Sequence, residues 1–580
     1  MLQKLKSFLR NNFNGKFLFL LCIIIVTMMA MHYYMAFTVD FESRPGLCNA
    51  VSNLLSCVID VTVIYLLAYA VTWGRVKTAL IISYWVTAIL AFCNIVYARF
   101  FGLYLPKKVL AQVTNLNDQD VALSILSGLS RMDLVYFAVI LVVGCLFLRW
   151  SNECLKRKSF PTLGAVFSVA LAGHFAAMFL LLASGREHTW KKAREIMVAT
   201  REQSIWEPNT YLFRNGFTRR FLYCFDDYRS HSFQLEPDQV AAIDTLRADQ
   251  TLRRTDGPAL TGKNLVFILV ESYLAASSDL VVDGQEVTPF LNRLKREGDC
   301  YYNGHLQPDI TCGESSDGQL LYMTGVLPLQ ADITVSIAKD LDLQGLPEIL
   351  HRDGWVADSH VIVPTSATFW SQDRMSDVYG FRTLYAKSDI KGKTSGENLT
   401  DEEIFSFAAS VDTVVARPFF SLILTMSMHE PYNHAMQHGF ALTDGSLPEN
   451  YRNYLIDCHY FDAQLERYIQ SLKDAGIYDD SILIIVSDHD AHPAMLDMEN
   501  RISTDLPLYI INGDIDPSSA WTGSCHQLDV YTTILDLIGA GTDWLGLGHT
   551  LLTDDYTDSV TEEARTASEW IIRGNYFGSR

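Results

Sequence analysis

The first third of this 580-residue chain contains five long apolar stretches, and these constrain its fold more than any other feature. A helix needs roughly 20 apolar residues to cross a bilayer, and every stretch except the shorter fourth approaches that length. The first stretch is too long, and too plainly followed by others, to be a cleaved signal peptide. The sequence therefore predicts an N-terminal transmembrane domain over 1–185, with helices near 17–37, 54–73, 79–98, 134–148 and 161–184.

The distribution of Lys and Arg predicts how these helices are oriented. Loops on the side of the N-terminus carry ten Lys or Arg residues and the opposite loops carry five. Because cytoplasmic loops are enriched in Lys and Arg, the N-terminus is expected in the cytoplasm, and five crossings place everything after Ser184 outside. Residues 1–185 have a net charge of +8 and the remainder −28. An acidic external region argues against nucleic acid as a partner.

The rest of the chain divides into three parts. Residues 186–235 mix basic and aromatic residues, which predicts interfacial linker helices or an ordinary linker packed on the external domain. Residues 236–560 alternate helical and strand patterns, which predicts an α/β domain with a mostly parallel sheet and helices on both faces. We expect strands at 264–270, 359–364, 419–427, 481–487 and 507–511, and helices at 236–247, 288–297, 316–325, 346–352, 402–410, 448–474 and 527–538. Residues 561–580 form a C-terminal tail without a clear pattern.

Acidic and His residues follow two of the predicted strands directly. Glu271 follows strand 264–270, and Asp488 and His489 follow strand 481–487. Open α/β sheets place their sites at the carboxyl ends of strands. A Glu at such a place can also cap a helix, and most Asp-His pairs are structural. Two carboxylates and an imidazole at strand ends nevertheless favour a site for one divalent metal.

Ser315 lies where a loop rich in Gly, Ser and Asp becomes a predicted helix. It could be an ordinary N-cap. It could also be a nucleophile whose hydroxyl is ionised by a metal, and a helix N-terminus would favour the charge of an attacked phosphate. Thr311, Cys312 and Ser316 are nearby competitors, and spacing alone does not choose among the four.

Further candidates follow other strands or lie within the apolar stretches. His429 follows strand 419–427, and Trp370 follows strand 359–364; both are site candidates, although a core His and a packed Trp are the ordinary alternatives. Asp60 and His174 lie within predicted spans, where ionisable residues are costly and often functional. Either could instead bond to a neighbouring helix.

The eleven cysteines show no zinc-binding spacing. Four lie in the predicted spans, where apolar packing is the expected role. A disulfide between Cys300 and Cys312 is one pairing that an oxidising compartment would allow.

Five segments taken in order resemble one family. They are Leu269-Val-Glu271-Ser-Tyr273, Thr288-Pro-Phe-Leu-Asn292, Gly313-Glu-Ser-Ser-Asp317, Met428-His429-Glu-Pro431 and Asp488-His489. Together they resemble the lipoteichoic acid synthase family, membrane-bound phosphoglycerol transferases of the alkaline phosphatase/sulfatase superfamily. The resemblance covers nearly the whole chain, and its motifs are strong jointly and weak singly. It implies a sulfatase-like catalytic domain over 236–560, outside the cytoplasm of a bacterium.

The resemblance also implies roles for individual residues. Glu271, Ser315, Asp488 and His489 would hold one Mn²⁺ or Mg²⁺, or Zn²⁺, and Ser315 would be the nucleophile. The family typically has Thr at that position, and either hydroxyl supports the chemistry.

The donor headgroup would be contacted by His429 and Trp370. The family usually has an Arg two residues after this Trp. Here that position is Gln372, with Arg374 nearby, so both become substrate-binding candidates and the identity of the headgroup stays open.

The implied activity is transfer of phosphoglycerol from a phospholipid, phosphatidylglycerol first, to a glycan or glycolipid through a covalent Ser intermediate. A phosphoethanolamine transferase is the main alternative. A sulfatase is less favoured because the segment around Ser315 lacks the Pro and Arg of the sulfatase motif. A non-enzymatic sensor would be expected to have lost a metal ligand, and all four are present.

Overall fold

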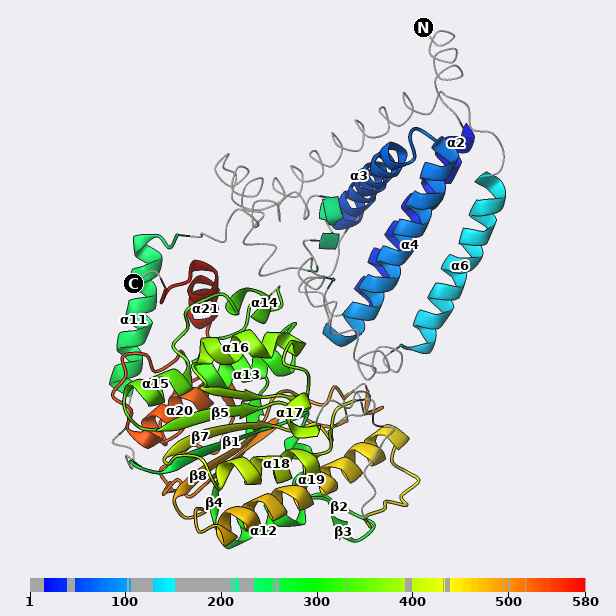
Figure 1. Cartoon of the computed structure of the whole chain (residues 1–580). Helices are drawn as coiled ribbons and strands as arrows, with labels where there is room; N and C mark the ends of the chain where they lie inside the picture. The colour runs from blue at the N-terminus through cyan, green and yellow to red at the C-terminus, as the bar shows by residue number, and fades with distance from the viewer. Residues whose placement is uncertain are drawn as a thin grey trace. The chain divides into compact units, whose positions relative to one another are not determined.

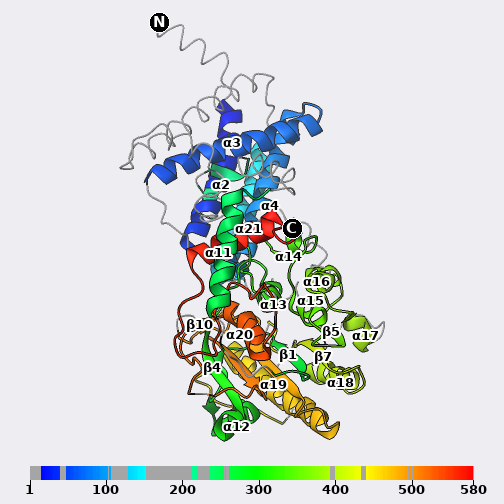
Figure 2. The same cartoon turned by 90° about the vertical axis from the view of Figure 1, so that its left-hand side faces the viewer.

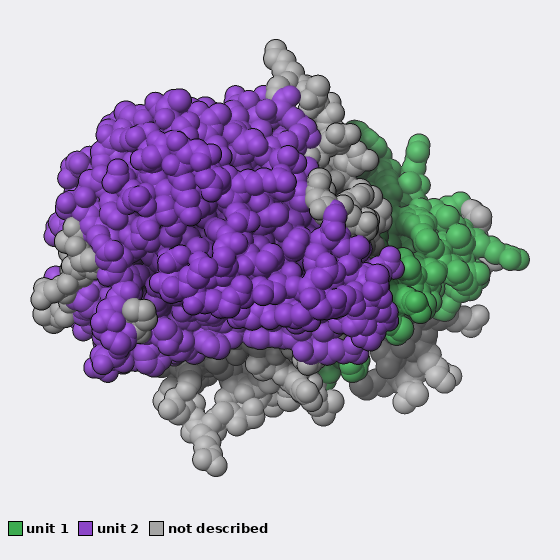
Figure 3. Space-filling model, turned by 90° about the horizontal axis from the view of Figure 1, so that it is seen from below, with its two compact units in different colours: residues 1–107, 128–231 green, residues 108–127, 232–580 purple. Residues whose placement is uncertain are grey.

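The computed structural model of the chain is shown in Figure 1. It describes residues 15–38, 47–101, 104–105, 129–151, 209, 212–213, 215–218, 234–253 and 255–578, the last range with gaps at 256–259, 331, 392–398, 431, 433–438, 494, 499–500 and 517. The chain forms two compact units, which Figure 3 colours separately. Unit 1 comprises residues 1–107 and 128–231, and unit 2 comprises residues 108–127 and 232–580.

Among its described residues, unit 1 has four helices that are long and apolar enough to cross a membrane. They are α2 (Gly15–Thr38), α3 (Leu47–Val71), α4 (Val76–Phe101) and α6 (Arg131–Ser151). Their inward faces share an apolar core that includes Ile24, Tyr65, Tyr84 and Phe147. The four helices agree with the first four predicted spans. The fifth predicted span, 161–184, lies outside the described residues, and so does His174.

Most of the predicted linker at 186–235 also lies outside the described residues. Phe213 and Phe217 are described, and their rings lie 6.0 and 5.6 Å from the ring of His32 on α2. These two aromatic residues therefore pack within unit 1. The proposed interfacial character of the rest of the segment stays a prediction.

Unit 2 is built on an eight-stranded mixed sheet with the order β10-β4-β9-β8-β1-β7-β5-β6. Its strands are β1 (Asn264–Val270), β4 (Cys300–Gln307), β5 (Asp358–Ile362), β6 (Thr383–Tyr385), β7 (Phe419–Leu424), β8 (Ser481–Ser487), β9 (Leu506–Ile511) and β10 (Cys525–His526). Only β9 runs antiparallel to its neighbours β8 and β4. A separate hairpin pairs β2 (Val281–Val282) with β3 (Gln285–Glu286). The central strands β1 and β8 are buried along their whole length, as their unbroken apolar runs predict.

Helices cover both faces of this sheet (Figures 1 and 2). On one face lie α13 (Ser315–Thr324), α15 (Leu346–Arg352), α16 (Gln372–Tyr379) and α20 (Leu528–Ile538), and on the other lie α12 (Pro289–Glu297), α18 (Asp401–Asp412) and α19 (Glu449–Asp474). The remaining helical segments are α11 (Pro237–Arg253), η2 (Ala275–Ser277), α14 (Val335–Ala338), η3 (Phe369–Ser371), α17 (Lys387–Lys391) and α21 (Glu562–Gly574). The predicted mostly parallel sheet with two covered faces is confirmed.

Unit 2 differs from the prediction in several features, and its unpredicted elements include β6, β10, α14, α16 and α17. The tail contains α21, whose Ile571 and Ile572 are fully buried. Strand β4 was missed because its sequence, CYYNGHLQ, is largely polar and buries only alternate residues. Cys300 at its start carries a free thiol, so the disulfide with Cys312 does not form.

Candidate active site

The site begins where the central strands of unit 2 end. Strands β1 and β8 are parallel neighbours, and Val270 pairs in register with Ser487. The next residue on each strand, Glu271 and Asp488, therefore projects from the same edge of the sheet. Strand β7 pairs with β1 on its other side, and the hydroxyl of Thr425 just beyond β7 accepts a hydrogen bond from the Glu271 N–H at 3.0 Å. The register of three parallel strands thus fixes the place of both carboxylates.

Helix α13 brings Ser315 to this edge. The helix packs directly against the end of β8, because a Cβ atom on Gly318 would lie only 2.3 Å from the carbonyl oxygen of Asp488. Any larger residue at position 318 would push the helix away. Ser315, at the first turn of this helix, is thereby held close to the residues that follow β1 and β8.

Four predicted residues come together here. Ser315 Oγ lies 3.2 Å from His489 Nε2 and 3.5 Å from Glu271 Oε2. His489 Nε2 lies 3.4 Å from Glu271 Oε1 and 3.6 Å from Asp488 Oδ2. Ligand atoms of Glu271, Asp488 and His489 all lie within 4.8 Å of one another. Sequence reasoning thus placed these four residues in one cluster, and the fold assembles them.

The ionisable groups of this cluster are buried, and burial and their mutual charges shift their pKa values. Glu271, Asp488 and His489 are 7, 3 and 5% exposed. Burial and the neighbouring charge of Glu271 raise the pKa of Asp488 to about 7. The pKa of Glu271 is lowered to about 2 against the effect of burial, through its hydrogen bond to His489 and the charges of His429 and His489. The pKa of His489 is raised, again against burial, by Asp488 and Glu271. Two facing carboxylates of this kind are stabilised by a cation.

The donor atoms fit a divalent metal. His489 Nδ1 lies 2.7 Å from the carbonyl oxygen of Asp490, so it donates there and leaves Nε2 as the ligand atom. Glu271 and Asp488 add carboxylate oxygens and Ser315 adds a hydroxyl. A set of oxygen atoms with one imidazole suits Mn²⁺ or Mg²⁺, and Zn²⁺ also accepts such ligands. The donor set of these four residues therefore suits one divalent metal ion.

The hydroxyls that compete with Ser315 are engaged elsewhere. Ser316 Oγ donates to the carbonyl oxygen of Gly313 at 2.6 Å. Thr311 Oγ1 lies 2.9 Å from Asp317 Oδ2 and 2.8 Å from the carbonyl oxygen of Leu329. Cys312 is fully buried. Of the four candidates, the contacts of the described residues direct only Ser315 into the carboxylate cluster.

His429 lies beyond β7, near the cluster. Its Nδ1 is 2.5 Å from the carbonyl oxygen of Glu430, which leaves Nε2 for another partner. Burial lowers its pKa, but the charges of Glu271 and Glu430 outweigh burial and raise it. A half-buried imidazole whose protonated form is favoured by two carboxylates is suited to contact an anionic group.

The Trp370 loop is strained, and its neighbours point elsewhere. Trp370 and Ser371 have φ of 48° and 56°, values that residues other than Gly rarely adopt. Gln372 is buried and donates to Gln319 Oε1 on α13 at 2.7 Å. Arg374 is exposed and pairs with Asp340. Among the contacts of the described residues, those of Gln372 and Arg374 do not reach the cluster, and their role toward a headgroup stays a prediction.

Two residues near Ser315 and His489 were not predicted as site residues. Glu314 Oε2 lies 3.3 Å from His492 Nε2, and the two belong to segments that also hold Ser315 and His489. Burial lowers the pKa of His492, but the charge of Glu314 outweighs it and the pKa is about 9. The signal in the sequence was their position: one residue before Ser315 and three after His489.

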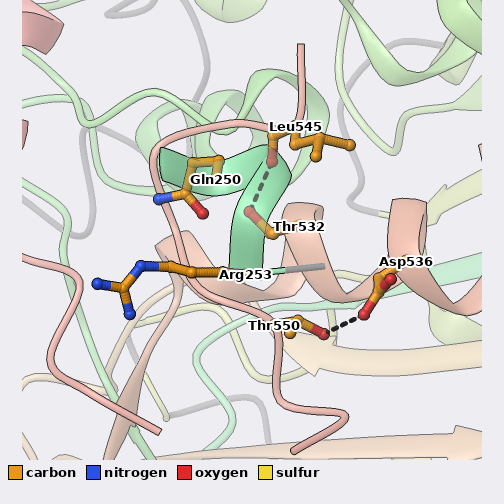
Figure 4. A pocket seen from close by; sticks show the side chains of 6 residues that line it. All are labelled: Gln250, Arg253, Thr532, Asp536, Leu545 and Thr550. Atoms are coloured by element: carbon orange, nitrogen blue, oxygen red, sulfur yellow. Dashed lines mark hydrogen bonds between the residues drawn. The ribbon is translucent and has the colours of Figure 1, made fainter. Parts of the chain in front are cut away.

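A small cavity elsewhere in unit 2 is separate from this cluster (Figure 4). It lies between α11, α20 and the loop after α20, and hydrogen bonds join Thr532 to Leu545 and Thr550 to Asp536 beside it. It contains none of the predicted site residues. Its lining residues are Gln250, Arg253, Thr532, Asp536, Leu545 and Thr550.

Comparison with known proteins finds matches to both parts of the chain. Residues 1–197 match the model of the lipoteichoic acid synthase N-terminal domain, and residues 263–540 match the sulfatase model. Lipoteichoic acid synthase of Staphylococcus saprophyticus is 25% identical over 94% of this chain and 85% of its own length. Lipoteichoic acid synthase 2 of Bacillus subtilis is 24% identical over 93% of this chain and 84% of its own length.

Solved structures are also similar. The crystal structure of the lipoteichoic acid synthase LtaP from Listeria monocytogenes matches with a TM-score of 0.44 and 18% identity, over 56% of this chain and 81% of that one. The two family models together cover more than half of the chain, and the two curated relatives span nearly all of it. The chain therefore joins a region that matches the lipoteichoic acid synthase N-terminal domain to a region that matches the sulfatase model, and it is similar to lipoteichoic acid synthases over most of its length.

Proposed function

We propose that this membrane protein transfers the phosphoglycerol headgroup of a phospholipid, phosphatidylglycerol first, to a glycan or glycolipid of the cell envelope. The observation that carries the proposal is the placement of Ser315 Oγ, 3.2 Å from His489 Nε2 and 3.5 Å from Glu271 Oε2, at the start of a helix. The relatives, which are lipoteichoic acid synthases over almost the whole chain, support the same reaction class.

The reaction has two displacements at phosphorus. Ser315 Oγ forms a bond to the phosphorus of the headgroup, and the bond from phosphorus to the diacylglycerol oxygen breaks. The diacylglycerol oxygen takes up a proton equivalent to the one that the Ser hydroxyl loses. The acceptor hydroxyl then attacks the resulting phosphodiester on Ser315, and the Ser hydroxyl is restored.

The residues of the cluster have distinct parts in this scheme. Glu271, Asp488, His489 and Ser315 would hold the divalent metal. When bound, such a cation lowers the pKa of the Ser hydroxyl and offsets charge on the phosphate. The N–H groups of Ser316 and Asp317 in the first turn of α13 bond to the carbonyl oxygens of Gly313 and Glu314, so the helix would favour an attacked phosphate through the dipole at its N-terminus. His429 would contact the headgroup, and Trp370 would line its site.

The catalytic unit would lie outside the cytoplasm. The ten-to-five Lys and Arg asymmetry supports a cytoplasmic N-terminus, and the match to the lipoteichoic acid synthase N-terminal domain supports a multi-pass plasma-membrane protein. A phosphatase reporter that is active only outside the cytoplasm should therefore be active when it is fused after residue 240. Activity of a cytoplasmic reporter at that point would contradict this topology.

The donor is tested with fluorescent phosphatidylglycerol and Mn²⁺ in detergent micelles. The full-length protein should release fluorescent diacylglycerol, and Ser315→Ala should release none. Ser316→Ala is the matched control, since the Ser316 hydroxyl only bonds to Gly313 O, and it should keep most of the rate.

The competing donor is tested in the same assay. If phosphatidylethanolamine is consumed and phosphatidylglycerol is not, the phosphoglycerol assignment is wrong and a phosphoethanolamine transferase replaces it. Equal rates for wild type and Ser315→Ala would remove Ser315 from the reaction.

A further inference from the structure

The turn that leads into Ser315 has an unusual backbone. Glu314 has φ 45° and ψ −124°, a conformation that Gly adopts readily and other residues rarely do. Its carbonyl oxygen accepts hydrogen bonds from the N–H groups of Asp317 and Gly318, at 2.8 and 3.1 Å. The orientation of the Glu314 residue therefore determines how α13 begins and where Ser315 points.

A side-chain contact holds this turn from the other side of the site. Glu314 Oε2 lies 3.3 Å from Nε2 of His492, which follows the metal-binding segment after β8. His492 also has a left-handed backbone, with φ 45°. Strained residues of this kind persist only where the surroundings determine them strongly, and they concentrate at functional sites. Both ends of one contact are strained here; Glu314 directly precedes Ser315, and His492 lies three residues after His489.

A second metal does not explain the pair well. Glu314, His489 and His492 lie close enough to share a cation. His489 Nδ1, however, already donates to the Asp490 carbonyl oxygen at 2.7 Å, and its Nε2 faces Glu271, Asp488 and Ser315. His489 has no ligand atom left for a second site.

We propose that Glu314 and His492 are a positioning pair, and this proposal rests on the proposed role of Ser315. Their contact holds the strained turn and thereby aims Ser315 Oγ at Glu271 and His489. The pair acts through Ser315 and does not itself touch the phosphorus. Asp317 holds the near side of the same turn, since its Oδ2 accepts from the N–H groups of Thr311 and Gly313.

The test uses substitutions whose effects on backbone strain and on the contact differ. Glu314→Gly removes the contact and also removes the strain, so the thermal midpoint should stay unchanged or rise. Its kcat for diacylglycerol release should fall about 10- to 100-fold, the effect of a nucleophile displaced by about 1 Å. The donor KM should stay within about threefold, because binding of the headgroup is not removed. Glu314→Gln keeps an acceptor for His492 and should recover most of the rate.

Two further variants separate positioning from general damage. His492→Ala should match Glu314→Gly, and the double variant should be no slower than either single one, because both break the same contact. Asp497→Gly is the control: Asp497 also has a left-handed backbone, φ 57°, but it is exposed, and its rate should not change. Additive losses, a rate that falls only with the thermal midpoint, or a Gln variant as slow as the Gly variant would each overturn the proposal.

Mn²⁺ binding, measured without lipid, distinguishes this proposal from the donor assignment. Glu314→Gly should weaken Mn²⁺ binding about tenfold, and Ser315→Ala should weaken it by a similar factor; the double variant should bind no more weakly than Ser315→Ala alone. If this holds while phosphatidylglycerol is not consumed, the donor is wrong and the pair stands. If wild type consumes phosphatidylglycerol, and the Glu314→Gly variant has normal Mn²⁺ affinity and a normal turnover rate, the proposed positioning role of Glu314 and His492 is wrong.

Discussion

Asp60 in unit 1 and Asp488 in unit 2 are both almost completely buried, but their surroundings differ. Asp60, on α3, is 1% exposed, and each of its oxygens accepts a backbone N–H at 2.7 Å, from Phe217 and from Thr218. A Cβ atom on Gly216 would lie 2.5 Å from Asp60 Oδ2, so the chain packs tightly around that carboxylate. Asp488 is 3% exposed, and only Oδ1 accepts backbone N–H groups. Its Oδ2 faces His489.

The difference separates a carboxylate that organises structure from one that is available for chemistry. A buried charge is tolerated when hydrogen bonds satisfy it, as they do at Asp60. Two buried carboxylates that face each other, as Glu271 and Asp488 do, remain unfavourable until a cation joins them. An ionisable residue in an apolar span is therefore not by itself evidence of function, although the sequence alone left both readings of Asp60 open.

The largest expected effect is at Asp488. Asp488→Asn removes one ligand charge and should lower turnover by at least about 1000-fold, since metal stabilisation of the transition state amounts to several kcal/mol. In EDTA the same variant should unfold at a higher temperature than wild type, because the repulsion with Glu271 is gone. Differential scanning calorimetry and metal analysis check the two parts. Full metal content with normal turnover would remove Asp488 from the site.

Asp60→Ala should lower the stability of the protein and leave its metal content unchanged, the opposite of what is expected for Asp488→Asn. It leaves two buried N–H groups without an acceptor, which should destabilise the protein by about 2–5 kcal/mol. The Mn²⁺ content of the folded protein should not change. Denaturation of the full-length protein in detergent measures the change in stability, and metal analysis of the folded fraction measures the Mn²⁺ content. Unchanged stability together with a loss of bound Mn²⁺ would contradict the structural role assigned to Asp60.

A smaller effect is expected at Thr425, which orients a ligand without being one. Thr425→Val removes the hydroxyl that accepts from the Glu271 N–H, and it should weaken Mn²⁺ binding by about 10- to 100-fold. Thr425→Ser keeps the hydroxyl and is the matched control. Calorimetric titration with Mn²⁺ compares the three proteins. Equal affinities would show that the strand register alone positions Glu271.

Much of the fold could be predicted from local pattern. The apolar runs at 264–270 and 481–487 match β1 and β8 residue for residue, because central parallel strands are apolar on both faces. The residues that follow them, Glu271 and Asp488, were therefore correctly placed at one edge. Strand β4 could not be found in this way, since most of its residues are polar. Helix α21 does have a helical pattern, with Thr561 as N-cap and buried Ile571 and Ile572, and the sequence prediction overlooked it.

The site was predictable only in part. Clustering of Ser315 with His489 agrees with the sequence prediction. Residue spacing left Thr311, Cys312 and Ser316 open beside Ser315, and only the family resemblance implied Ser315; the hydrogen bonds of Thr311 and Ser316 now favour the same residue. The contact between Glu314 and His492 joins positions 178 residues apart and has no pattern in the sequence. The lipoteichoic acid synthase resemblance is confirmed over both parts of the chain.

The most direct test of the central claim is peptide mass spectrometry of the full-length enzyme trapped with phosphatidylglycerol and Mn²⁺ in the absence of an acceptor. The account predicts a glycerol phosphate adduct on the peptide that contains Ser315, located on Ser315 by fragmentation and missing from Ser315→Ala. An adduct on Thr311 or Ser316 instead, or a Ser315→Ala protein that still releases diacylglycerol, would contradict it.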